Sequence, residues 1–481
     1  MNKKNYNYLF IVGTSLLVLV LPWFNYTVDR WRVLHSDYSH YYAGETPNKT
    51  FLKTKYLIEH PKQAKSILMG SSNGGYMDAN LIAPNTYNMK YNFGLLAIHL
   101  QNVETMLKEG VKIENLWVGI NDYIIWKSPK DYENSFDRST YKSDFTEDIK
   151  TYLYYLFRKP NMKDLYLYQG KYRLLKSSII TDPQPHLEAK KRENEHLKDS
   201  KAWKKHMDKL APTLLRYNDT TYRIDQAVSE IKELKKLCDT HHIKLKLFMY
   251  PVFYKAFLAY NQFKMEEFKK KLVKTMPFYD FYQLNDRAIN GVNWQDSMHF
   301  SYSTGNFIIK SIQNGKYLVN SKNIEKDISE NHNNLKNFIR STNKKFFRIN
   351  GNIDVSILDE LYTFNNLPYT ITKEGIQTKN DLNSTIFGND IIVYLKDIQV
   401  SSKNILLHME IESSVDTNCI FYYKEHADSN YDEAHTFRPQ LKKGNNHISI
   451  IVPASIINNI LRFDIRREKG TYKIKTFKLY K

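Results

Sequence analysis

Short apolar segments alternate with amphipathic helices between residues 50 and 320, and this alternation constrains the fold more than any other feature. Strands are expected at 66–69, 85–91, 115–119, 243–250 and 278–281. Helices are expected between these strands. One follows the second strand, with Leu96, Leu100, Val103 and Leu107 on one face; others lie near 222–239 and 265–274, and a last one begins near Ser303. This order predicts an open parallel α/β sheet whose site lies at the carboxyl ends of the strands.

Four turns after these strands carry side chains of compatible chemistry. They are Gly70-Ser71-Ser72, Asn92-Phe93-Gly94, Gly119-Ile120-Asn121-Asp122 and Asp296-Ser297-Met298-His299. A serine in a turn after a strand exposes its hydroxyl where helix amides can stabilise an oxyanion. Each turn alone is also typical of an ordinary loop, because lone histidines seldom do chemistry and aspartates often cap turns. The four in this order favour a serine-dependent acyl site.

With these four motifs, residues 60 to 320 resemble the SGNH (GDSL-like) hydrolase superfamily, in particular its membrane-anchored members that act on cell-envelope polysaccharides. The resemblance implies a three-layer fold with Ser72 as nucleophile, His299 as general base and Asp296 as the group that orients the imidazole. It also implies an oxyanion hole made by the Ser72 amide, the Gly94 amide and the Asn121 side chain. The family's Gly-Asp-Ser is Gly-Ser-Ser here, which leaves Ser71 as an alternative to Ser72. No metal and no cofactor are expected.

Two aromatic residues beside these motifs, Tyr123 and Trp294, could flank a sugar ring, and plain packing is the alternative. A helical insertion is expected at 127–221, with helices at 152–157, 165–175 and 188–210. It carries 20 Lys and Arg against 14 Asp and Glu, a net charge of +6. The insertion either covers an edge of the sheet or forms a lid or docking surface.

The amino-terminal segment 8–24 contains no charged residue and has about the length that the shortest membrane-spanning helices need. Trp23 and Phe24 would lie at the far interface. No small-residue cleavage site follows, so residues 1–30 are predicted to be an uncleaved signal anchor in the cytoplasmic membrane. We expect the amino terminus inside and the remaining chain outside the cytoplasm, periplasmic or extracellular.

The composition changes beyond residue 320. Residues 321–345 are predicted to be a linker with at most a short helix, and residues 346–481 an antiparallel β-sandwich. Its expected strands are 390–395, 404–411, 419–423, 447–452, 461–466 and 472–479, punctuated by Gly388, Gly444 and Gly470. This part faintly resembles β-sandwich modules of bacterial surface-glycan enzymes, so glycan binding and a purely structural role both stay open.

The net charge of +19 and the pI near 9.3 indicate an anionic partner, and the predicted membrane anchor disfavours nucleic acid. Cys238 and Cys419 lie in different predicted domains, so neither a structural disulfide nor a metal site is expected. The hypothesis is serine-dependent removal or transfer of an acyl group, here O-acetyl, on a cell-surface polysaccharide. One alternative is a non-catalytic glycan-binding or assembly protein that partners a membrane acyltransferase, and another is a lipid esterase.

Overall fold

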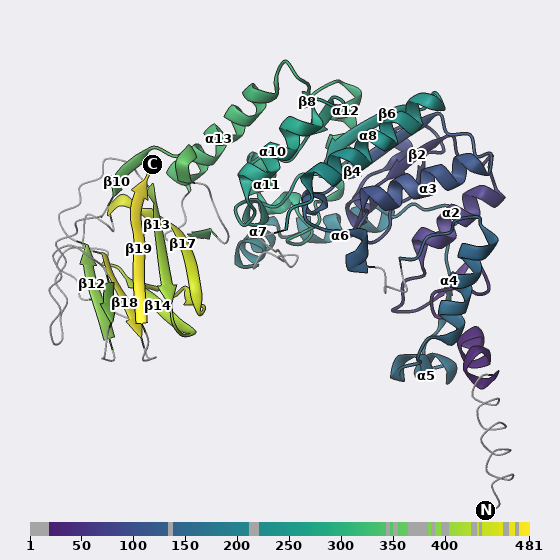
Figure 1. Ribbon diagram of the computed structural model, residues 1–481, viewed down its shortest axis with the longest axis horizontal. Helices are drawn as coiled ribbons and strands as arrows, with labels where there is room; N and C mark the ends of the chain where they lie inside the picture. The colour runs from purple at the N-terminus through teal and green to yellow at the C-terminus, as the bar shows by residue number, and fades with distance from the viewer. Residues whose placement is uncertain are drawn as a thin grey trace, which may run out of the picture.

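The computed structural model describes residues 19–132, 138–210, 221–342, 347–349, 355–363, 383–385, 390–395, 404–424, 431, 435–455, 461–466 and 471–481 (Figure 1). They form a mixed α/β part followed by antiparallel sheets near the carboxyl terminus. The predicted turns at Gly388 and Gly470 lie outside the described residues. Gly444, at a φ of +102°, begins a strand, which agrees with its predicted role.

The central sheet of the α/β part has six strands in the order β3-β2-β4-β6-β7-β8. Their bounds are β2 Ser66–Met69, β3 Tyr87–Asn88, β4 Asn115–Ile120, β6 Lys244–Met249, β7 Phe278–Asp280 and β8 Leu318–Val319. The five predicted strands are present and parallel. The prediction of a purely parallel sheet is wrong at one edge, because the two-residue strand β8 pairs antiparallel with β7. Strand β3 is also shorter than predicted.

Helices α3 (Leu96–Lys108), α8 (Ile224–Thr240) and α10 (Gln262–Leu272) connect consecutive parallel strands, and neighbouring helices of this row pack together. Their apolar residues are buried at helical spacing, as in Ile224, Ala227, Ile231 and Leu234 of α8. Helix α12 (Tyr302–Gln313) packs against the short helix η1 (Ser72–Tyr76), which follows β2. Other α-helices of this part are α2 (Lys49–Glu59), α9 (Tyr254–Phe257) and α11 (Asp286–Ile289).

The insertion is helical, as predicted, but its divisions differ from the prediction. It contains α4 (Phe145–Phe157), α5 (Met162–Tyr168), β5 (Leu174–Lys176), α6 (His186–Leu197) and α7 (Ser200–Lys209). The single charged helix predicted at 188–210 is two helices, because the side chain of Asp199 accepts a hydrogen bond from Ala202 N and caps α7. The helix predicted at 165–175 ends at Tyr168, and Leu174 instead pairs with β1 (His40–Tyr42).

The segment predicted to be a linker contains the 18-residue helix α13 (Ile324–Ser341). Its buried face includes Ile328 and Leu335 but also two polar residues, Asp327 and Asn331. Asp327 Oδ1 accepts a hydrogen bond from Gln283 Nε2, and Asn331 Oδ1 accepts one from Leu284 N. These polar residues interrupt the apolar periodicity that would have indicated a helix.

Two antiparallel sheets occupy the carboxyl-terminal part. One has the order β10-β19-β13-β17-β9 with β11 on β19, and the other has the order β12-β18-β14-β15 with β16 on β14. The six predicted strands are all present, as β12 Asp390–Leu395, β13 Asn404–Ser413, β14 Thr417–Tyr422, β17 Gly444–Pro453, β18 Leu461–Arg466 and β19 Thr471–Tyr480. The short strands are β9 Phe347–Ile349, β10 Glu360–Thr363, β11 Asn383–Thr385, β15 Thr436–Phe437 and β16 Gln440–Leu441.

The predicted membrane-spanning segment 8–24 lies largely outside the described residues, which begin at residue 19. Residues 19–28 are helical, and Trp23 is more than half exposed. Among the helices that the structure describes, none has both the length and the apolar character needed to cross a bilayer.

The carboxyl ends of β2, β4 and β6 meet around one aromatic side chain. Tyr250 follows β6 and is fully buried, and its ring and hydroxyl occupy the space beside Gly70 and Gly119 where a Cβ atom would otherwise stand. Gly70 in turn precedes the Ser71-Ser72 turn. The two glycines therefore allow Tyr250 to fill the end of the sheet directly beneath the predicted nucleophile.

We expect Gly119→Ala to destabilise the α/β part by about 1–3 kcal/mol or more, because the new methyl group would overlap the Tyr250 ring. All six tryptophans precede residue 300, so the midpoint of urea unfolding followed by tryptophan fluorescence reports on this part. In a Tyr250→Leu background the same substitution should cost much less. An equal cost in both backgrounds would show that Tyr250 is not the constraint.

Candidate active site

Ser72 is the first residue of η1, directly after the turn that ends β2. Its Oγ lies 2.8 Å from Nε2 of His299. Ser71 is buried, and its Oγ accepts a hydrogen bond from Asn73 N at 3.2 Å, so it caps η1. Of the two serines that sequence analysis left open, Ser72 is the one that contacts the imidazole.

The loop that carries His299 is held by Asp296. One carboxylate oxygen, Oδ1, accepts backbone hydrogen bonds from Met298 N at 2.7 Å and His299 N at 2.8 Å. A bridge between Trp294 and Phe300 closes the base of the loop. Asp and His three residues apart can therefore face each other because the loop turns around the carboxylate.

The same carboxylate contacts the imidazole. His299 Nδ1 lies 2.8 Å from Asp296 Oδ2 and 3.0 Å from Oδ1. Burial alone would raise the pKa of Asp296, but the hydrogen bond and charge of His299 and the two backbone amides outweigh it and lower this pKa. The Asp296 carboxylate is thus ionised at neutral pH and directs the second imidazole nitrogen, Nε2, towards Ser72.

A pocket of about 270 Å³ opens beside this hydroxyl–imidazole–carboxylate chain. Its lining includes the apolar side chains of Phe93, Val252 and Phe253, together with Asn121 and Tyr123. Asn121 Oδ1 accepts a hydrogen bond from the Tyr123 hydroxyl at 3.3 Å. Within the described chain no protein acceptor takes the Asn121 Nδ2 group, so it remains as a donor for a ligand in the pocket.

Gly94, predicted to offer an oxyanion amide, lies against the backbone of Gly70 and Ser71. A Cβ atom on Gly94 would stand 2.7 Å from Ser71 N, so only glycine fits this position. Asn92 and Phe93, which precede it, line the pocket, and Phe93 adopts a positive φ of 50°. The structure therefore brings the second motif to the serine turn, and the role of the Gly94 amide stays a prediction.

Trp294, predicted as a candidate to line the substrate site, is a core residue instead. It is 1% exposed, its Nε1 donates to Arg287 O at 2.9 Å, and its ring packs 5.5 Å from that of Phe253. It is absent from the pocket lining, whereas Tyr123 is part of it. The plain-packing alternative is correct for Trp294 because its polar atom is satisfied by backbone.

Two residues that sequence analysis did not assign to the site contribute to it. Tyr76 stacks on the His299 ring, with the centroids 5.3 Å apart. Asp122 lines the pocket, and burial raises its pKa to about 7 against the lowering effect of the Tyr123 amide. A turn aspartate is not distinguishable by sequence from this buried acid, because the burial comes from packing of distant segments.

Tyr76 also lines a second, larger cavity of about 680 Å³. This cavity contains side chains of both charges, namely Lys53, Lys90, Arg192, Asp182 and Glu188, together with Tyr41. Burial, and then the charge of Arg192, lower the pKa of Lys90. A polar, tyrosine-lined space thus borders Tyr76, the residue whose ring stacks on the imidazole.

Scanned against protein-family models, the chain matches none, and a search of the curated proteins finds no match.

Asp122 generates a pH-dependent prediction. Its pKa is about 7 in the folded protein and 3.8 ordinarily, so between these values the folded state holds a proton that the unfolded state has released. Stability therefore falls as pH rises through this window. Asp122→Asn removes this titrating group. The free energy of unfolding of the variant minus that of the wild type should therefore rise by about 2–3 kcal/mol between pH 5 and pH 7, because only the wild type loses stability.

Urea unfolding at several pH values, followed by tryptophan fluorescence, measures this difference. Asp286→Asn, at an exposed carboxylate, is the matched control and should follow the wild-type pH dependence. Parallel wild-type and Asp122→Asn curves would contradict the assignment of a raised pKa to Asp122.

Proposed function

We propose that this chain is a serine-dependent acyl esterase or acyltransferase of the SGNH-like type, which removes or transfers an O-acetyl group on a cell-surface polysaccharide. The observation that carries the proposal is the hydrogen-bonded chain from Ser72 through His299 to Asp296 at the mouth of a pocket. A hydroxyl, an imidazole and an ionised carboxylate in this order form the arrangement that activates serine for attack on an ester.

In the proposed reaction, Ser72 Oγ attacks the ester carbonyl and its proton passes to His299 Nε2. The negative oxygen of the tetrahedral intermediate is stabilised by Asn121 Nδ2 and by the backbone amides of Ser72 and Gly94. Collapse expels the alcohol, which takes the proton from His299 and leaves an acyl group on Ser72. A second hydroxyl then loses its proton to His299 and attacks the acyl-enzyme. The bond from the acyl carbon to Ser72 Oγ breaks, Oγ takes the proton back from His299, and the acyl group leaves on the second oxygen.

The acceptor in the second step is water for an esterase and a sugar hydroxyl for a transferase. The larger cavity that Tyr76 also lines supports a glycan, because its charged side chains and tyrosines, such as Arg192, Glu188 and Tyr41, offer donors, acceptors and ring faces to sugar hydroxyls. The smaller pocket, of about 270 Å³ next to Ser72, has room for the acyl group of the ester. We therefore favour a polysaccharide substrate over a lipid ester.

Exposed apolar side chains support a membrane location, and the predicted placement outside the cytoplasm rests on the amino-terminal segment alone. On α4 they recur every four residues, at Phe145, Ile149, Leu153 and Phe157, and Phe145 is 81% exposed. On α5 they include Met162, 61% exposed, and Tyr168, which packs against Trp23 and Phe24 of the amino-terminal helix.

Helices α4 and α5 adjoin the described start of the chain (Figure 1). Asn25 Nδ2 donates to Leu156 O at 2.7 Å and to Arg158 O at 2.9 Å, which ties the amino-terminal helix to the end of α4. Large exposed apolar patches mark membrane or protein contacts. In our proposal residues 1–30 form the membrane anchor and α4 and α5 rest on the lipid surface beside it.

The carboxyl-terminal sheets form the proposed β-sandwich, with glycan binding as one role and structural support as the other. The alternative function is a non-catalytic glycan-binding or assembly protein that partners a membrane acyltransferase, in which case the apolar face of α4 and α5 would contact that enzyme. The hydrogen-bonded Ser72 and His299 favour the enzyme, because an unused serine turn would not require this geometry.

Ser72→Ala and His299→Ala should each lower the hydrolysis of a small aryl acetate by about 10⁴-fold or more, because both groups act as one unit. A fluorophosphonate probe should label wild type and not Ser72→Ala. Ser71→Ala is the matched control and should keep most of the activity, since the Ser71 hydroxyl caps η1 whereas the hydroxyl of Ser72 contacts the imidazole. Absence of both hydrolysis and labelling in the wild type would reject the enzyme and favour the assembly protein.

The proposed membrane contact predicts a change in polarity around α4. Cys238 and Cys419 are buried, so a single Leu153→Cys can be labelled with a polarity-sensitive fluorophore in the full-length protein. Reconstituted in lipid vesicles, this label should emit at shorter wavelength than one on Lys236→Cys, an exposed position of α8. Equal emission from the two positions would contradict contact of α4 with lipid.

A further inference from the structure

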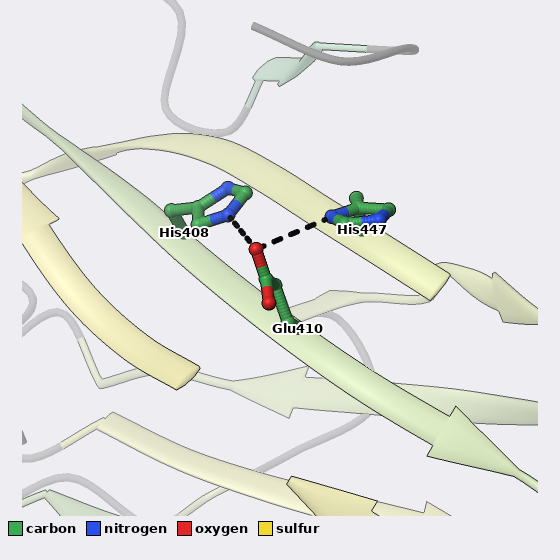
Figure 2. A group of neighbouring side chains, drawn as sticks. All are labelled: His408, Glu410 and His447. Carbon is green, nitrogen blue, oxygen red and sulfur yellow. Dashed lines mark ion pairs between the residues drawn. The ribbon is translucent and has the colours of Figure 1, made fainter. Parts of the chain in front are cut away.

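Two histidines and a glutamate converge on one face of the carboxyl-terminal sheet. His408 and Glu410 are two residues apart on β13, so they lie on the same face of the strand. His447 of the neighbouring strand β17 is the direct cross-strand partner of Glu410. Figure 2 shows both imidazoles directed at the Glu410 carboxylate.

The spacing of these three groups is too long for hydrogen bonds and suited to a shared ligand. His408 Nε2 and His447 Nδ1 each lie 3.6 Å from Glu410 Oε1, and all three ligand atoms lie within 4.8 Å of one another. Around a tetrahedral zinc ion with bonds of about 2.0–2.1 Å, ligand atoms are separated by roughly 3.3 Å. Small side-chain rotations would bring the group to this spacing.

The His408 side chain is already prepared as a ligand. It is only 5% exposed, and its Nδ1 lies 2.9 Å from Ser449 Oγ, on the strand that carries His447. If Nδ1 donates to this hydroxyl, the lone pair is on Nε2, which faces Glu410. Metal-binding histidines usually have such a second hydrogen bond that fixes the ring.

Neighbouring cations have other carboxylate partners. Lys478, the β19 residue opposite His408, lies 3.1 Å from Glu360, and Lys475 lies 2.9 Å from Glu412. Glu410 Oε2 accepts a hydrogen bond from Thr476 Oγ1 at 3.4 Å, so its other oxygen, Oε1, faces the histidines. No lysine thus occupies the position between the imidazoles in the part of the chain that the structure describes.

We propose that His408, Glu410 and His447 bind a divalent transition-metal ion, for which zinc is the best match. Two imidazoles with one carboxylate suit zinc and similar ions, whereas calcium and magnesium prefer oxygen ligands alone. Three protein ligands leave a fourth position for water or for an oxygen of a bound molecule. The ion would also join β13 to β17. This site is independent of the serine site and of the function proposed for it.

The test is zinc binding to the full-length protein, purified without a polyhistidine tag and treated with a chelator. Competition with a chromophoric chelator should give one zinc ion per chain at pH 7.5. Glu410→Gln and His447→Ala should each weaken binding at least tenfold, and both positions are exposed enough for the chain to fold. Glu412→Gln, the next carboxylate on the same face of β13, is the matched control and should bind as wild type does.

Cobalt substitution tests the geometry separately. Cobalt(II) in this site should give the intense visible absorption of a four-coordinate ion, and Glu410→Gln should weaken or abolish it. Absence of stoichiometric zinc binding in the wild type would overturn the proposal. Binding that is unchanged in both Glu410→Gln and His447→Ala would also overturn it, because the ion would then lie elsewhere.

Discussion

The close approach of three strand ends around Tyr250 is the constraint on which the candidate active site depends. Gly70 and Gly119 lack the Cβ atoms that would displace this ring, and Gly94 packs against the backbone of the serine turn from the opposite side. The turn that presents Ser72 is therefore fixed by close packing beneath it. Ser72, Asn121 and His299 come from different loops, so the distances between their side chains depend on how closely these strand ends pack.

The sequence was most informative where a local pattern and the final environment agree. Buried strands such as β2 and β4 read as apolar runs with a glycine at or next to their end. Strands β13, β17 and β19 contain stretches in which apolar and polar residues alternate, so the positions of all these strands were predicted within a few residues. Ser72 follows β2 directly, and Asp296 and His299 belong to a short motif that comes after β7 and α11, so the family resemblance carried by these motifs could indicate all three. The parallel topology then requires the carboxyl ends of β2 and β7 to share one edge of the sheet.

The errors occur where a residue's environment is created by distant segments. Trp294 resembles a surface aromatic in a loop, but Arg287 and Phe253 enclose it. Helix α13 was not evident because Asp327 and Asn331 occupy its buried face to bind the loop after β7. The His408, Glu410 and His447 cluster depends on the register between β13 and β17, which no spacing along a single segment specifies.

The hydroxyl–imidazole contact joins residues 227 positions apart. Almost the whole α/β part, including the insertion, lies between Ser72 and His299, so this contact forms only after both ends of the sheet are in place. A chain that crosses a membrane unfolded would carry Ser72 as an ordinary alcohol without reactivity towards esters. If the chain acts as we propose, Ser72 becomes reactive towards esters only after the α/β part has folded.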